Sequence, residues 1–154
     1  MKLRKGFTLV ELLIVIIIIG ILAAAMLLSS GSATASAEAS NIITGLRSLK
    51  SASLLWWSDN LDATTVPAIA QLDQYMDNPG KLVGYSFTSH TDGAWWVFCT
   101  MTTANVSSGV AEVGRKLTGK RTSIGLYIAP VARNTMITNP GDYAGAAVVY
   151  MIAR

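Results

Sequence analysis

The sequence is poor in the residues that build most catalytic and metal sites. It has one cysteine, Cys99, and one histidine, His90, among 154 residues. A lone cysteine excludes an intramolecular disulfide, and a lone histidine excludes any site that needs two imidazole ligands. Charged residues make up 14% of the chain and apolar residues 51%. We therefore predict a protein that is not an enzyme, with no catalytic, cofactor-binding or metal-binding residues, in which Cys99 is a small buried apolar residue and His90 lies in a surface loop.

The excess of positive charge belongs to the first few residues. Lysine and arginine total 12 against 9 aspartate and glutamate residues, and Lys2, Arg4 and Lys5 account for the difference. The sequence pI of about 9.2 is therefore no sign of nucleic-acid binding, because it reflects the positive flank of an apolar segment. In the rest of the chain the acids gather before residue 93 and the bases after it. This distribution suits head-to-tail contacts between identical subunits, or a solvated surface with internal ion pairs.

What the sequence has in abundance is one long apolar run. From Leu12 to Leu28 every residue is apolar or glycine. A helix from Phe7 to Leu28 would rise about 33 Å, enough to cross a hydrocarbon core of roughly 30 Å. Glu11 stands at the head of this run, where an ionised carboxylate is unfavourable unless it finds a partner. A cut between Gly6 and Phe7 would create such a partner, because the new terminal amine is positive and could meet Glu11 of a neighbouring copy.

The order Gly-Phe-Thr-Leu-Val-Glu at residues 6–11, followed by the apolar run, resembles the prepilin-type cleavage and methylation segment of type IV pilins and of the pseudopilins of type II secretion. The resemblance covers about 25 residues. It implies that Gly6 is the last leader residue read by a prepilin peptidase and that Phe7 becomes the N-methylated first residue of the mature subunit. It also implies that Glu11 sets the filament register by pairing with the Phe7 amine of another subunit.

The same resemblance implies partners and a location. The partners are identical or related pilin subunits in a homopolymer, a prepilin peptidase and methyltransferase, an inner-membrane assembly platform, and membrane lipid before assembly. The subunit would be a single-pass protein of the bacterial inner membrane first, and part of a surface pilus or a periplasmic filament afterwards. A major pilin, a minor pilin and a pseudopilin of a type II secretion or DNA-uptake system all fit, as do motility, adhesion, secretion and DNA uptake.

Two other interpretations of the same segment stay open. A secretory signal peptide could be cleaved near Ala35 or Ala37, which would release an exported soluble binding domain. A plain one-helix anchor with no role in assembly is the second. Against the first, the apolar run exceeds the usual 7–15 residues of a signal peptide, and a glutamate at its head does not help export. Neither explains the Gly-Phe-Thr-Leu-x-Glu order.

Helical periodicity continues beyond the apolar run. After the small-residue stretch Ser29–Asn41, apolar and small residues recur at i, i+4, i+7, i+11 and i+14. This helical spacing predicts one helix from Thr8 to Trp57. The residues of this stripe are Ile42, Leu46, Leu49, Ser53 and Trp56. The predicted divisions are a prepilin leader at residues 1–6, a transmembrane and filament-core helix at 7–28, its amphipathic continuation at 29–58, and a globular head at 59–154.

The head is predicted to be small and to mix helices with strands. One short helix is predicted over Val66–Met76, and a second contains Val106, Val110, Val113 and Leu117 at helical spacing. The predicted fold class is α+β and pilin-like, with the long helix packed on a four-stranded antiparallel sheet. The four strands are Leu82–Thr88, Ala94–Thr102, Ser123–Ala129 and Ala144–Ala153, with a hairpin turn over Ser89–Gly93 and another turn over Asp77–Gly80.

Three weaker signals were weighed. Residues 114–120 have the spacing of a phosphate-binding loop, but Arg121 replaces the required serine or threonine, so we reject it. Asp59 and Asp62 are candidate calcium ligands, and turn chemistry at a helix end explains them better. A basic cluster could contact DNA phosphates or could be the solvated end of a helix, and the second interpretation is favoured. The cluster is Arg115, Lys116, Lys120 and Arg121.

Overall fold

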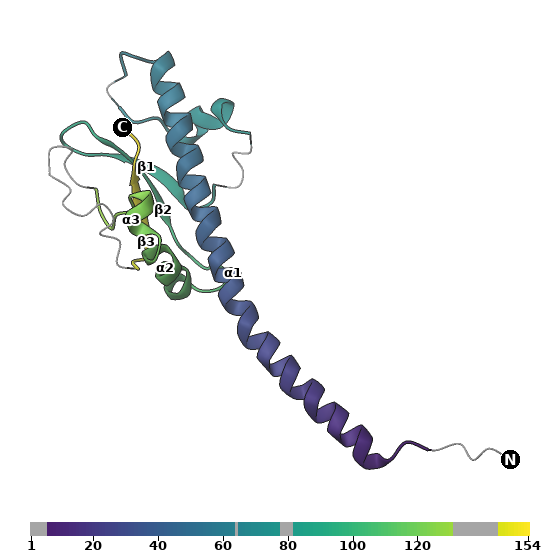
Figure 1. The fold of residues 1–154 in the computed structure, drawn as a ribbon. Coiled ribbons are helices and arrows are strands. Elements are labelled where there is room, and N and C mark those ends of the chain that lie inside the picture. Colours follow the sequence, from purple (N-terminus) through teal and green to yellow (C-terminus); the bar gives the residue numbers. More distant parts are fainter. Residues whose placement is uncertain (1–5, 64, 78–81, 131–144) are drawn as a thin grey trace. The chain divides into compact units, whose positions relative to one another are not determined.

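The computed structural model describes residues 6–63, 65–77, 82–130 and 145–154 (Figure 1). The chain divides into two units, Met1–Thr34 and Ala35–Arg154, which we call the N-terminal unit and the head unit. Along the chain the described elements are the helix α1 (Leu9–Asp59), the 3-10 helix η1 (Ile69–Tyr75), the strands β1 (Tyr85–Ser89) and β2 (Trp95–Thr100), the helices α2 (Val110–Thr118) and α3 (Arg121–Ile124), and the strand β3 (Val148–Ile152).

The long helix is confirmed almost to the residue. It was predicted from Thr8 to Trp57, and α1 runs from Leu9 to Asp59. In the N-terminal unit its large apolar side chains are between 45% and 82% exposed. By length and composition α1 can cross a membrane, with a mean hydropathy of 3.1 over its most apolar window. So much exposed apolar surface is stable only in lipid or against other apolar helices.

The part of α1 in the head unit is amphipathic, as its periodicity predicts. Ile42, Leu46, Leu49, Ser53 and Trp56 are all buried, none of them more than 8% exposed. The apolar members pack in one core with alternate residues of β2 and β3 and with the apolar face of α2. Because a strand turns successive side chains to opposite faces, alternate residues of the sheet can all face α1.

Three antiparallel strands form the sheet, in the order β1-β2-β3 (Figure 1). The register pairs Phe87 with Val97 and Val97 with Met151. The neighbouring tryptophans of β2 go to different cores. Trp95 packs against Trp56 of α1, with ring centroids 6.1 Å apart, while Trp96 meets Tyr127 edge-to-face at 5.1 Å. The sheet is therefore covered by aromatic rings on both faces, which suits a central strand.

The α+β class is confirmed, but the predicted fourth strand, Ser123–Ala129, is wrong. Arg121–Ile124 forms α3, and Gly125 ends that helix with a φ of 73°, a conformation that glycine adopts at little cost. Only Tyr127 then pairs, in a single antiparallel bridge to Tyr150. Since Pro130 follows and has no backbone N–H, the pairing does not extend into a strand.

Both predicted short helices begin later than expected, and α2 begins at Val110, after Val106. The predicted helix over Val66–Met76 is a 3-10 helix that begins later, at Ile69, after extended backbone at Ala68. Its start is marked by Gln71, whose side-chain Oε1 accepts a bond of 2.8 Å from the Ala68 N–H. Most of the predicted turn over Asp77–Gly80, and most of the connection that precedes β3, lie outside the described residues.

Backbone bonds and a stacked arginine hold the end of β3. The Trp95 N–H donates to the Arg154 carbonyl at 3.0 Å, and the Ala153 N–H donates to the Trp95 carbonyl at 2.8 Å. The Arg154 guanidinium lies 3.8 Å from the centroid of the Trp57 ring and 5.1 Å from that of Trp95. A cation over two indole faces contributes about 1 kcal/mol or more. This contact joins the segment after β3 to the end of α1.

A carboxylate near the start of the head unit anchors the segment that leads into α2. Glu38 accepts bonds from the Ser107 N–H at 2.8 Å, the Ser107 hydroxyl, and the Ser108 N–H at 3.1 Å. Desolvation opposes the charge, but these bonds outweigh it and hold the pKa of Glu38 below its ordinary value. The contact spans 69 residues of sequence and fixes α2 beside the first turns of α1 in this unit.

We expect Glu38→Gln to lower the free energy of unfolding at pH 7 by about 1 kcal/mol, because a neutral amide oxygen accepts weaker bonds than a carboxylate. A lowered pKa in the folded state stabilises the protein above the unfolded pKa, and this contribution is lost as pH falls through the folded pKa. The difference in the free energy of unfolding between the wild type and Glu38→Gln should therefore narrow once the pH drops below about 4.5. Urea unfolding in detergent at several pH values measures it, with Glu112→Gln as the control. A gap that stays constant down to about pH 3 would contradict this account.

Candidate processing and assembly segment

The residues before α1 are open to a processing enzyme. Residues 6–8 have no helical or strand structure, and Gly6 and Phe7 are exposed. A side chain added at Gly6 would meet nothing within 4 Å. Nothing within the described chain therefore requires glycine at this position.

A reciprocal cap fixes Glu11 at the start of α1. The Thr8 N–H donates to Glu11 Oε2 at 2.8 Å, and the Thr8 hydroxyl donates to the same oxygen at 2.7 Å. The Glu11 N–H donates back to Thr8 Oγ1 at 3.2 Å. This is a capping box, in which the first free N–H groups of a helix are satisfied by side chains. The sequence prediction did not include this box, although Thr-x-x-Glu just before an apolar run is its signature.

The electrostatics of the segment are set by one charge. Glu11 is the only charged side chain between residues 6 and 34. It lies in the first turn of α1, where the positive end of the helix dipole favours a negative charge. Both Thr8 bonds end on Oε2, so the box leaves Oε1 for a further donor. The capping box thus holds the carboxylate in place without using all of its capacity to accept bonds.

Comparison with known families gives a match over this segment. Residues 1–27 match the family described as the prokaryotic N-terminal methylation motif. The chain carries a prepilin-type signal. This confirms the resemblance to type IV pilins and pseudopilins for this segment, whose apolar residues belong to a helix long and apolar enough to cross a membrane. The roles of Gly6, Phe7 and Glu11 within the signal stay predictions.

The rest of the chain is not matched. Neither the curated proteins nor the solved structures contain a significant match to this chain. The head unit is therefore interpreted from its own residues, and the prepilin-type signal carries the relation to known proteins.

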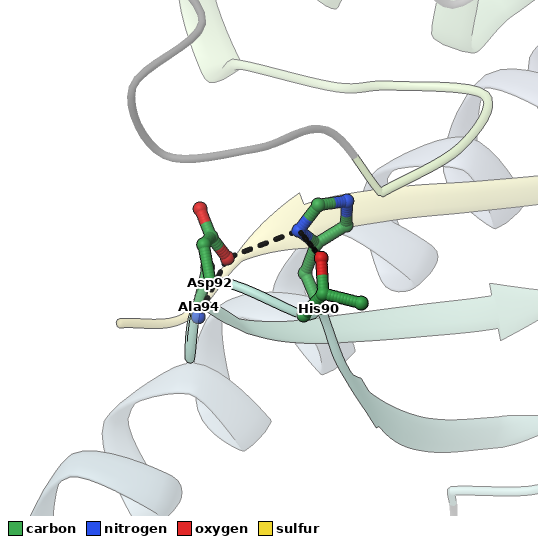
Figure 2. Close-up of polar contacts among 4 residues, drawn as sticks. His90, Asp92 and Ala94 are labelled. Atoms are coloured by element: carbon green, nitrogen blue, oxygen red, sulfur yellow. Dashed lines mark hydrogen bonds and ion pairs between the residues drawn. The ribbon is translucent and has the colours of Figure 1, made fainter.

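The lone histidine lies in the β1–β2 hairpin, as predicted (Figure 2). Its Nδ1 is 3.1 Å from Asp92 Oδ1, and the same oxygen accepts a 3.0 Å bond from the Ala94 N–H. The turn closes through the His90 N–H, which donates to the Ala94 carbonyl at 2.8 Å. Asp92 therefore contacts residues on both sides of the turn, His90 and Ala94, and stabilises the hairpin.

The candidate calcium residues Asp59 and Asp62 lie at the end of α1 and just after it. Asp59 Oδ2 accepts a bond of 2.7 Å from the Tyr75 hydroxyl of η1. This bond raises the pKa of Tyr75 above its ordinary value. In the described part of the chain no three histidine, cysteine or acidic residues gather as metal ligands would. Asp59 instead ties η1 to the end of the long helix.

The basic cluster surrounds the end of α2, as predicted for a helix C-terminus. Gly114 lies inside α2, where an added Cβ would approach the Gly145 carbonyl oxygen to 2.9 Å. Because α2 ends at Thr118 with Gly119 as its C-cap, the segment ends a helix, as predicted, and Lys120 then precedes the four-residue helix α3. Arg115 pairs with Glu112, and the Lys120 ammonium donates to the Ser40 hydroxyl at 3.1 Å. The cluster lies beside the first turns of α1 in the head unit.

Cys99 is buried in β2, as predicted. Burial raises its pKa to about 11, with a hydrogen bond from Tyr85 as a smaller opposing effect. We expect the folded protein to resist alkylation by iodoacetamide at about pH 8, by at least roughly a hundredfold relative to the urea-unfolded chain, because the thiolate is scarce and shielded. Mass spectrometry over time measures the rate. Equal rates in the two states would contradict this placement of Cys99.

Proposed function

We propose that the protein is a structural filament subunit. The Gly6–Phe7 bond is cut, Phe7 is N-methylated, and the mature chain polymerises through its apolar helix into a type IV pilus or a related filament. The single observation that carries the proposal is the placement of Glu11, a capped carboxylate at the head of an exposed apolar helix, four residues after Phe7 in a prepilin-type signal. The role is structural rather than enzymatic.

The pairing of Glu11 with the Phe7 amine of a neighbouring subunit has a specific energetic role in assembly. Before assembly, lipid covers the exposed apolar side chains of α1. Exchanging lipid for neighbouring helices changes their hydrophobic free energy little, because lipid tails are as apolar as leucine. The free energy of the Glu11 carboxylate changes more in this exchange. In lipid its charge is unpaired and costly, and in the filament the Phe7 ammonium group of a neighbour pairs with it. Close van der Waals packing between the helices holds the filament, and the bond between Glu11 and the Phe7 amine of a neighbour selects the axial step.

The parts of the chain then have distinct roles. Residues 1–6 are a removable leader, residues 7–28 cross the membrane and later form the filament core, residues 29–58 continue the helix, and residues 59–154 form the surface-facing head. The partners of the subunit are other copies or related pilins, the prepilin peptidase and methyltransferase, and an inner-membrane assembly platform. The filament lies on the cell surface or in the periplasm.

The first test is the intact mass and N-terminal residue of the protein recovered from cells. We expect a chain that begins at Phe7 and carries one extra methyl group, because the prepilin-type signal is both a cleavage and a methylation signal. A chain that begins near Ser36 or Glu38 would mean that a secretory signal peptide is removed, and it would overturn the proposal.

The second test separates the charge of Glu11 from its capping role. Glu11→Gln keeps the helix cap, since glutamine serves at this position of a capping box, but it removes the charge. Thr8→Ala removes the cap and keeps the charge. We expect Glu11→Gln to reduce sheared filament yield at least tenfold while Thr8→Ala retains half or more of it. Both variants should be processed and inserted normally. Filaments at the wild-type level from Glu11→Gln would contradict the register role.

A further inference from the structure

Strand β1 lies at one edge of the sheet, with β2 as its only neighbour among the described strands. The Thr100 N–H donates to the Gly84 carbonyl at 2.8 Å, and the His90 N–H donates to the Ala94 carbonyl at 2.8 Å. These two bonds fix which residues face β2, because antiparallel strands exchange hydrogen bonds at every second residue. Even-numbered residues from 84 to 90 therefore bond to β2, and odd-numbered residues direct their backbone groups away from it.

On its outer side, β1 presents backbone groups that no described residue pairs with. They belong to Phe87 and Ser89, neither of which forms a backbone hydrogen bond outside the ladder to another described residue. Tyr85 faces the same side, but its N–H donates to the Leu82 carbonyl at 3.2 Å. The open edge of β1 therefore consists of the N–H and carbonyl groups of Phe87 and Ser89.

The open edge lacks the features that usually protect an edge strand. Its five residues, Tyr-Ser-Phe-Thr-Ser, include no proline and no charged residue. They pair one-to-one with β2, without a bulge. Proline, lysine and bulges are the common means of keeping a further strand from pairing with an edge. The edge of β1 is thus suited to pairing with another extended segment.

The opposite edge of the sheet is already bridged. The Ala153 N–H donates to the Trp95 carbonyl, so the even-numbered residues of β3 face away from β2. The middle one, Tyr150, exchanges two bonds of 2.9 Å with Tyr127. A strand from another molecule would have to displace this bridge. Among the strands that the structure describes, β1 is therefore the one with an uninterrupted free edge, and a second copy can supply only its own β1.

We infer that the open edge of β1 pairs with β1 of a second copy, so that two heads share one antiparallel sheet. The contact is isologous, since the same strand serves on both sides. Phe87 of each copy lies opposite Ser89 of the other, and these two pairs exchange four backbone hydrogen bonds. This register uses every open group of the edge. It places Thr88 of the two copies opposite each other, on the two-fold axis.

The contact is separate from the repeating contacts of a filament, because a two-fold pairing stops at two copies. Two short strands form a weak contact in dilute solution. Confinement strengthens it, since copies whose apolar helices are held in one membrane have a high effective concentration. The inference does not depend on the proposed filament, because it concerns the strand edge of the head unit.

Disulfide trapping in isolated cell membranes tests the pairing in the full-length protein. Thr88→Cys places a thiol on the two-fold axis, where facing Cα atoms are about 4.5 Å apart, within the range of a disulfide. Ser86→Cys is the matched control. Both residues are half-buried and on the same face of β1, but the two copies of residue 86 would lie about 13 Å apart along the strands. After mild oxidation we expect at least tenfold more dimer from Thr88→Cys.

A proline provides the second measurement. Ser89→Pro removes an N–H that faces away from β2, so it blocks the contact between copies and leaves the β1–β2 ladder in place. Added to Thr88→Cys, it should lower the dimer yield at least tenfold. Resistance of Cys99 to iodoacetamide shows that the head of this variant is folded. A dimer yield that stays at the Thr88→Cys level would contradict the pairing.

Each other outcome also decides the inference. Equal dimer yields from Thr88→Cys and Ser86→Cys, or no dimer from Thr88→Cys, overturn it. A Thr88→Cys chain that forms a disulfide with a different protein and none with itself assigns the edge to a foreign strand, which also overturns the self-pairing. These results do not involve the N-terminus or the filament yield. Failure of the pairing therefore leaves the proposed function standing, and a chain that is not cut before Phe7 leaves the pairing standing.

Discussion

The structure depends on one constraint: a long apolar helix that the rest of the chain leaves uncovered. In the N-terminal unit the large side chains of α1 stay exposed, and one carboxylate stands at its head. Water is an unsuitable solvent for this surface, so the segment requires lipid or other helices. Thr8 caps Glu11, and no other charged side chain stands between residues 6 and 34.

In the head unit, other elements of the chain cover one face of the same helix. There the small and apolar stripe of α1 is covered by one face of the sheet and by α2. With no disulfide available, closure comes from contacts that join distant residues. Arg154 stacks on Trp57, Glu38 holds the Ser107 segment, and Asp59 holds Tyr75. Each ties a later element to α1, so the helix is the scaffold to which the other elements attach.

Sequence reasoning succeeded where the pattern is local. The spacing from Ile42 to Trp56 predicted the buried stripe, and the Asp-Gly pair predicted the hairpin that contains His90. It failed at Ser123–Ala129, where alternation suggested a strand but Gly125 ends a short helix instead. The bond of Glu38 to Ser107 joins residues 69 apart, and no local rule selects such a partner. The capping box of Thr8 and Glu11 has a local signature, Thr-x-x-Glu before an apolar run, and is predictable from the sequence.

The position of β3 has a consequence for the order of events during synthesis. The apolar start of α1 leaves the ribosome well before β3, which must pair with β2, about fifty residues earlier in the chain. Chain synthesis adds roughly 5–20 residues each second. The membrane segment is therefore available for insertion seconds before the sheet can close, and the buried stripe of α1 waits uncovered in the meantime. Prompt delivery to the membrane would protect the nascent chain during this interval, when its two apolar surfaces are open together.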